Sequence, residues 1–189
     1  MVVVGIAMLQ GARHAHVNAL ENAANELGVN IQIVQLRTKL DFDSNQIDAL
    51  MLPGGESTVM RLTGNNEASE LLPSMFNWLR EDPVRPVLAT CAGAILLVDP
   101  QDGGEALIDA EIDRNAYGGQ IDSFEASLDC GFPGIFIRAP RFGEVRDSIE
   151  CTLNGEVVGV RRINRIALTF HPELSDNSKY HRMLLEACI

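Results

Sequence analysis

The 189-residue sequence predicts an α/β fold in three layers, with a mostly parallel central sheet and antiparallel strands in the second half. Apolar runs of strand length alternate with segments of helical periodicity through the first half, which is the pattern of βαβ units. In the second half, short segments rich in Val, Ile and Phe are separated by Gly, Pro and Asn, which is typical of antiparallel strands. The length fits one domain, so we expect residues 1–189 to form a single domain.

The first half supplies the strands and helices of the parallel sheet. Residues 2–9 form a continuous apolar run, as expected for a strand that is buried on both faces. Residues 12–27 carry apolar side chains at helical spacing, and Gly28 follows as a stop. The further elements alternate in the same way, with strands at 31–36 and 49–52, a helix at 71–79, a strand at 86–90 and a helix at 92–98.

The second half is predicted to add short strands and a closing helix. The strands are expected at 123–128, 134–138, 156–160 and 166–170. The final helix has Asp176 as its candidate N-cap, and its apolar face holds Tyr180, Met183, Leu184 and Ala187. This layering is flavodoxin-like, and in such folds the functional site lies at the carboxyl ends of the parallel strands.

Composition excludes several classes of function. Fifteen Lys and Arg against 26 Asp and Glu give a net charge of -11, which repels nucleic-acid phosphates. No apolar run reaches the ~18 residues that span a bilayer, and no cleavable leader is recognisable. The four cysteines form no Cys-x-x-Cys pair and no cluster with His, which argues against disulfides and metal. We therefore expect a cytoplasmic protein that binds no nucleic acid, no membrane, no metal and no cofactor.

The first candidate for chemistry is Cys91, which lies between a buried strand and a helix. The neighbouring residues Ala92 and Gly93 are small, as a sharp strand-to-helix turn requires. Such a nucleophile elbow places a thiol at a helix N-terminus, which stabilises a thiolate and offers backbone N–H groups to an oxyanion. The alternative is a buried cysteine that only packs at the end of a strand.

The second candidate is the pair His171 and Glu173, which follows the apolar strand at 166–170. Residues two apart in an extended segment point the same way. A carboxylate beside an imidazole fixes its tautomer and supports the imidazolium. A His-x-Glu pair alone is more often surface charge, but its position at a strand end, downstream of a cysteine elbow, favours a Cys-His-Glu triad.

The third candidate is the glycine-rich loop 52–58. Gly54 and Gly55 let backbone N–H groups approach a developing negative charge. Taken alone, the segment favours a simple turn with a helix cap at Ser57. It has no Walker A lysine that would indicate a nucleotide phosphate.

Other charged and polar residues receive structural interpretations. Three histidines on predicted helices are expected to be solvated or to face a partner, namely His14, His16 and His181. A local basic cluster is expected in a solvated hairpin, formed by Arg161, Arg162 and Arg165.

The three candidate segments, in this order, resemble the class I glutamine amidotransferases. Six blocks are more closely similar to the glutaminase subunits of pyridoxal 5′-phosphate synthase, the PdxT family. These blocks are Met8-Leu9-Gln10-Gly11, Pro53-Gly54-Gly55-Glu56-Ser57-Thr58, Thr90-Cys91-Ala92-Gly93, Asp113-Arg114-Asn115, Phe136-Ile137-Arg138-Ala139-Pro140 and Phe170-His171-Pro172-Glu173-Leu174.

The resemblance implies a glutaminase that hydrolyses L-glutamine to L-glutamate and ammonia for vitamin B6 biosynthesis. It implies Cys91 as the nucleophile, His171 as the base and Glu173 as the residue that orients His171. The glutamine-binding residues that it implies are Gly55, Glu56, Ser57, Arg114, Ile137 and Arg138. The backbone N–H groups of Gly55 and Ala92 are the expected oxyanion donors, and Gln10 is expected to face the partner. That partner would be a (β/α)8 synthase subunit, which receives the ammonia within a large hetero-oligomer.

Two other functions remain open. The chain could be a glutaminase that serves another synthase, such as an imidazole glycerol phosphate or GMP synthase. It could also be a non-catalytic subunit that binds an amino acid or a partner through the same fold. The Gly-Gly-Glu-Ser-Thr segment argues against the first, and the intact triad argues against the second.

Overall fold

A seven-stranded sheet forms the centre of the computed structural model, which describes residues 1–11, 13–114 and 123–189. The strand order is β2-β1-β3-β4-β11-β10-β9. The pairs from β2 to β11 are parallel, and β10 and β9 extend the sheet as antiparallel strands. This topology confirms the predicted flavodoxin-like α/β fold with antiparallel strands from the second half. The predicted features at Ala12 and Asn115 lie outside the described residues.

The elements have the following bounds. The central sheet contains β1 (Val2–Ala7), β2 (Ile31–Leu36), β3 (Ala49–Leu52), β4 (Val87–Thr90), β9 (Ser148–Leu153), β10 (Glu156–Arg162) and β11 (Arg165–Leu168). Two small antiparallel sheets pair β5 (Ala110–Asp113) with β8 (Arg141–Val145) and β6 (Phe124–Ser127) with β7 (Pro133–Phe136). The helices are α1 (Arg13–Leu27), α2 (Lys39–Asp43), α3 (Ser57–Gly64), α4 (Leu71–Glu81), α5 (Ala92–Val98), the 3-10 helix η1 (Pro172–Leu174) and α6 (Lys179–Glu186).

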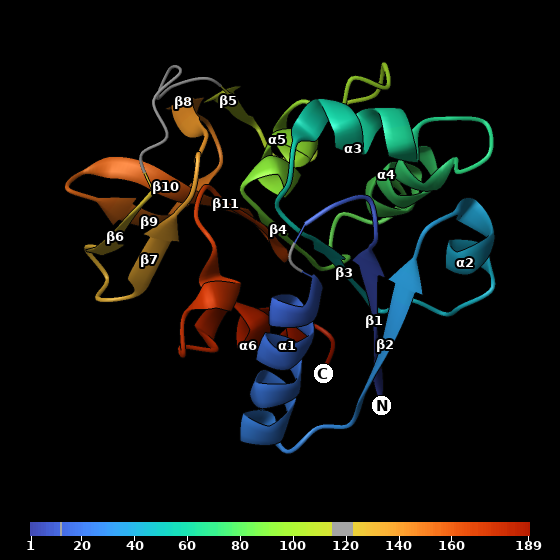
Figure 1. Ribbon diagram of the computed structural model, residues 1–189, viewed down its shortest axis with the longest axis horizontal. Coiled ribbons are helices and arrows are strands. Elements are labelled where there is room, and N and C mark those ends of the chain that lie inside the picture. The colour runs from blue at the N-terminus through green and yellow to red at the C-terminus, as the bar shows by residue number, and fades with distance from the viewer. Residues whose placement is uncertain (12, 115–122) are drawn as a thin grey trace.

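Helices cover both faces of the central sheet (Figure 1). Helices α1 and α6 lie on one face, and α2 to α5 lie on the other. Strand β3 is fully buried because alternate side chains enter the two cores, with Leu50 and Leu52 on the α4 and α5 side and Ala49 and Met51 on the α1 and α6 side. Among the described residues, no helix combines the length and apolar character needed to cross a membrane.

The parallel strands bring four segments to one edge of the sheet. Strands β1, β3, β4 and β11 all end at this edge, and the loops that follow them carry Gln10, Gly54, Cys91 and His171. The start of α5 packs closely against the end of β3, because a Cβ at Gly93 would collide with the backbone carbonyl of Leu52. Only glycine therefore allows α5 to begin directly above the sheet at this point.

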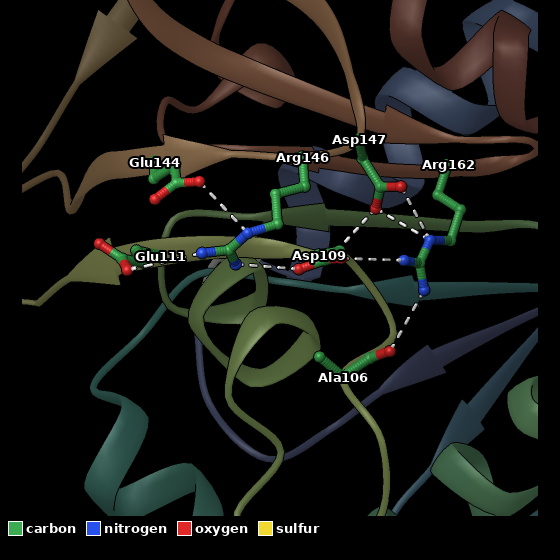
Figure 2. Close-up of polar contacts among 7 residues, drawn as sticks. All are labelled: Ala106, Asp109, Glu111, Glu144, Arg146, Asp147 and Arg162. Carbon is green, nitrogen blue, oxygen red and sulfur yellow. Dashed lines mark hydrogen bonds and ion pairs between the residues drawn. The ribbon is translucent and has the colours of Figure 1, made fainter.

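A cluster of ion pairs fastens the small β5–β8 sheet to the edge of the central sheet (Figure 2). Arg162 on β10 binds Asp147 at 2.9 Å, and the Asp147 carboxylate accepts the Asp109 backbone N–H at 2.6 Å. Arg146 contacts Asp109 at 3.2 Å and Glu144 at 3.3 Å. The cluster thus holds in place the strand that leads to Arg114, which extends from the end of β5.

The prediction of a solvated arginine hairpin is wrong for Arg165. Its side chain is only 4% exposed and donates hydrogen bonds to the backbone carbonyls of Leu79, Asp82 and Leu107. Burial lowers the pKa of Arg165, and the carbonyl acceptors bind its two terminal nitrogens. Arg165 therefore joins α4 to β11 inside the protein.

The N-caps of two helices differ from those predicted. Helix α3 begins after Glu56, whose carboxylate accepts the backbone N–H groups of Thr58 and Val59, so Ser57 is not the cap. Helix α6 begins after Ser178, and Asn177 rather than Asp176 accepts the N–H of Lys179, at 3.0 Å.

We expect Gly93→Ala to lower the free energy of unfolding by about 1–3 kcal/mol, the usual effect of overpacking a buried contact. Chemical denaturation measures this change. Gly143→Ala is a milder control, because a Cβ there comes no closer than 3.1 Å to its nearest neighbours, Cβ and Oε2 of the exposed Glu111, and needs only a small adjustment. Equal stabilities of the two variants would contradict the close approach of α5 and β3.

Candidate active site

Cys91 occupies a strained turn between β4 and α5. Its backbone angles are φ 50° and ψ -112°, a region that non-glycine residues rarely adopt. The turn is held from both sides, because the Cys91 N–H donates to Leu168 O at 2.8 Å and its carbonyl accepts from the Ala94 N–H at 3.1 Å. The residue is 6% exposed, and its thiol lies 3.8 Å from the Ile137 carbonyl oxygen. This is the geometry of a nucleophile elbow.

His171 and Glu173 follow β11 and form a hydrogen-bonded pair. The His171 backbone N–H donates to Ile135 O at 2.8 Å, which ties the segment to β7. Pro172 then starts the short helix η1, which turns the Glu173 side chain back toward the imidazole. The His171 Nδ1 to Glu173 Oε1 distance is 2.7 Å, and the carboxylate is 1% exposed.

The charges of this pair stabilise each other. Burial opposes the charged form of His171, but interactions with Cys91 and Glu173 outweigh it and raise the pKa of His171 to about 10. Burial also opposes ionisation of Glu173, yet hydrogen bonds from His16 and His171 hold its pKa well below the usual range. A carboxylate at Nδ1 leaves the other ring nitrogen of His171 free for Cys91. The two side chains are close together, because a Cβ built on Gly54 would lie within 3.2 Å of both.

Gly54 keeps the space between the cysteine and the imidazole open. A Cβ at this position would lie 2.7 Å from His171 Cε1 and 3.2 Å from Cys91 Cβ. The loop backbone therefore passes directly beside the two side chains. A backbone so close to a reacting centre is well placed to donate N–H groups to it.

The glycine-rich loop is held from the end of β1 by Gln10. The Glu56 backbone N–H donates to Gln10 Oε1 at 2.6 Å, and a Cβ at Gly55 would lie 2.9 Å from the same oxygen. Gly55 has φ 154°, which favours glycine. The Glu56 carboxylate caps α3, and its pKa is lowered by the N–H groups of Thr58 and Val59.

The remaining predicted site residues differ in their burial and in their contacts. Ala92 is buried at the start of α5, next to Cys91, and Ser57 is buried at the start of α3. Arg114 is exposed at the end of β5 and lies near enough to Glu56 to contribute to its lowered pKa. Arg138 is exposed in a left-handed conformation with φ 45°, and no contact joins it to the triad in the described part of the chain.

Two residues next to the triad were assigned wrongly from the sequence. His16 and His181 were expected to be solvated or to face a partner, but both are fully buried. His16 Nε2 lies 3.4 Å from Glu173 Oε1, the same oxygen that contacts His171 Nδ1. The available signal was helical spacing, because His16 lies one turn before Leu20 and His181 one turn before Leu185, on the buried faces of α1 and α6. His14 is exposed, as predicted.

Residues 1–11, 13–114 and 123–189 contain no group of three or more His, Cys, Asp or Glu side chains arranged to hold a metal ion.

Comparisons with known proteins agree with this geometry. The sequence profile of the SNO glutamine amidotransferase family matches residues 6–189. The pyridoxal 5′-phosphate synthase subunit PdxT of Thermococcus onnurineus is 40% identical over 204 residues, covering 100% of each chain. The subunit of the same name from Haemophilus ducreyi is 39% identical over 194 residues, covering 96% of this chain and 94% of its own. A solved structure described as a glutamine amidotransferase has a TM-score of 0.78 and 31% identity, covering 98% of each chain.

The fold and these similarities define a glutaminase-type class I amidotransferase. Within that class, the chain belongs to the SNO glutamine amidotransferase family. The resemblance inferred from the six sequence blocks is thereby confirmed.

We expect Gly54→Ala to slow glutamine hydrolysis by about 10²-fold, because the added methyl group would displace His171 from Cys91. Steady-state glutamate release, measured with the synthase subunit present, gives the rate. Gly155→Ala is the control, since it adds the same methyl group in the β9–β10 turn, where φ is 81° and any strain is confined to a turn that carries no predicted site residue. A rate for Gly54→Ala equal to that of the wild type would show that the loop does not confine the imidazole.

Proposed function

We propose that this chain is the glutaminase subunit of a pyridoxal 5′-phosphate synthase. It would hydrolyse L-glutamine to L-glutamate and ammonia through Cys91, His171 and Glu173 and pass the ammonia to the synthase subunit. The single observation that carries this proposal is the line from the Glu173 carboxylate through His171 to Cys91 in its strained turn. Because the site takes residues from Gln10 to Glu173, we treat residues 1–189 as one domain.

The proposed mechanism starts with attack by Cys91 as a thiolate on the carboxamide carbon of glutamine. The backbone N–H groups of Gly55 and Ala92 donate hydrogen bonds to the developing oxyanion. His171 then gives its proton to the departing nitrogen, and the C–N bond breaks to release ammonia and leave a thioester. Water, deprotonated by the same His171, attacks the thioester and releases glutamate and the free Cys91 thiol. Glu173 stays ionised and holds the His171 ring in place through both steps.

We further propose that glutamine lies between the glycine-rich loop and the β7 turn. Support comes from the Ile137 carbonyl at 3.8 Å from the Cys91 thiol and from the exposed Arg114 near the loop. The residues assigned to glutamine are Gly55, Glu56, Ser57, Arg114, Ile137 and Arg138. Glu56 is engaged as the cap of α3 and as the donor to Gln10, so its contribution is to fix the shape of the loop.

Ammonia becomes a poor nucleophile when it is protonated in water, so a glutaminase of this kind needs a covered route to an acceptor. We propose that the acceptor is a (β/α)8 synthase subunit in a large hetero-oligomer, as the names of the PdxT relatives and the resemblance suggest. We propose that Gln10, whose side chain is exposed, faces this partner.

We expect Cys91→Ser to abolish glutamate release. A hydroxyl is far less acidic than a thiol and does not form the attacking anion here, but its small size fits the turn. Glutamate release is measured with the synthase subunit present, and analytical ultracentrifugation should show unchanged association. Substantial turnover by this variant would remove Cys91 from the role of nucleophile.

Glu173→Gln should reduce kcat by on the order of 10³- to 10⁴-fold, because an amide no longer fixes the His171 tautomer or supports its charge. Glutamine KM should change little, since Glu173 lies behind the imidazole and is only 1% exposed. An unchanged kcat would show that Glu173 does not orient His171.

Formation of pyridoxal 5′-phosphate from glutamine by the reconstituted pair distinguishes this function from its alternatives. Glutaminase activity that supports a different synthase would point to another acceptor. A chain that binds glutamine without hydrolysing it, even with the synthase, would be a non-catalytic binding subunit.

A further inference from the structure

A second line of polar side chains continues from Glu173 into the interior of the protein. His16 on α1 and His181 on α6 are both 0% exposed. His16 Nε2 lies 3.4 Å from Glu173 Oε1, and His16 Nδ1 lies 3.1 Å from His181 Nε2. The line Cys91, His171, Glu173, His16, His181 therefore crosses from the site to the packing interface of α1 and α6.

The contacts decide which nitrogen of each ring carries a proton. Among the described residues, His181 Nδ1 has no hydrogen-bond partner and is buried, so a proton there would be an unsatisfied donor. It would also leave His16 either with a lone pair facing the Glu173 carboxylate or with a buried positive charge. A proton on His181 Nε2 avoids both, because it donates to His16 Nδ1 and leaves the His16 proton on Nε2, facing Glu173.

Burial and charge support this arrangement. Burial lowers the pKa of His181 to about 3, so the ring is neutral and has one N–H to give. The groups that face the His16 ring are Glu173 from η1, His181 from α6 and the Thr90 hydroxyl from β4, at 3.4 Å. Each N–H in the line thus points toward the carboxylate, and such chains strengthen one another.

Stability alone gives no reason for the two buried rings. Two polar rings in the core must be desolvated, and apolar side chains of similar size would avoid that cost. The Glu173 carboxylate, in contrast, is stabilised by the His16 N–H, since it is nearly inaccessible to water and its Oε2 has no hydrogen-bond partner in the described part of the chain. Without His16, His171 would be the one ring N–H left to it among these residues.

We propose that His16 is a positioning residue of the glutaminase site: its Nε2–H holds the Glu173 carboxylate in the orientation that serves His171, and His181 fixes the tautomer of His16. This proposal rests on the proposed function. It assigns part of the catalytic geometry to α1 and α6, which contribute no residue to the triad.

Substitutions at His16 test the proposal by separating the donor from the ring. His16→Leu removes the N–H donor and fills the space with an apolar side chain of similar size. His16→Gln restores an amide N–H close to the position of Nε2, whereas the shorter His16→Asn offers its amide toward His181 instead. His14→Leu on the exposed side of the same helix is the matched control.

Two measurements report on each variant. Glutamine hydrolysis with the synthase subunit gives kcat and KM separately. The pH dependence of Cys91 alkylation by iodoacetamide, followed on the isolated full chain by peptide mass spectrometry, reports thiolate reactivity without requiring glutaminase activity. Thermal unfolding checks that each variant is folded.

His16→Leu should lower kcat by about 10- to 100-fold and leave KM nearly unchanged. This is the range found in metal sites when a residue that orients a metal-binding side chain is removed. It should also slow alkylation of Cys91 near neutral pH and move the rise in rate to higher pH. His16→Gln should recover most of both losses, and His14→Leu should match the wild type in alkylation.

Wild-type kcat and alkylation in His16→Leu would overturn the proposal. A folded His16→Gln variant with kcat and alkylation as low as those of His16→Leu would also overturn it, because the imidazole ring and not its N–H donor would then matter. If His16→Leu does not fold, the Gln and Asn variants decide, and equal activity of these two contradicts the proposal. If the wild type releases no glutamate even with the synthase, the proposed function fails, while the alkylation series still decides the role of His16.

Discussion

The hydrogen bond between the Glu173 carboxylate and His171, at 2.7 Å, is the interaction on which the rest of the site depends. It joins a nearly inaccessible anion to an imidazole that in turn reaches the Cys91 side chain. Neither charge would persist alone at this depth, because burial opposes both ionised forms. Their proximity is what makes a charged pair stable beside a thiol. The proposed cleavage of an amide needs that pair, since the leaving nitrogen must receive a proton.

The parallel sheet supplies the convergence that this interaction requires. Strands β4 and β11 are neighbours in register, so the turn after Thr90 and the segment after Leu168 lie side by side at the carboxyl edge. Close backbone approaches then refine the geometry: Gly54 passes beside the imidazole and the cysteine, and Gly93 lets α5 start against β3. The same edge receives Gln10 from β1, which holds the glycine-rich loop. The fold thus positions the site through strand ends and glycine contacts rather than through long flexible loops.

The sequence predicted what depends on local patterns and on strand order. Cys91, His171 and Glu173 could be grouped because each follows an apolar strand, and parallel strands end at one edge. The burial of His16 and Arg165 could not be predicted in this way. His16 is buried only because α1 packs on α6, and Arg165 finds its carbonyl acceptors in segments more than fifty positions away in the chain. The cap of α3 was missed for a related reason, since Glu56 reaches the helix only through the conformation of the loop before it.

Labelling with a glutamine analogue that carries a diazoketone tests the central claim most directly. The reagent alkylates a thiolate only where the site binds glutamine and activates the thiol. With the synthase subunit present, we predict a single adduct on Cys91, prevented by excess glutamine, although Cys130 is the more exposed thiol. An adduct on Cys130, or no adduct on Cys91, would contradict a glutamine site built around this cysteine and its charged imidazole.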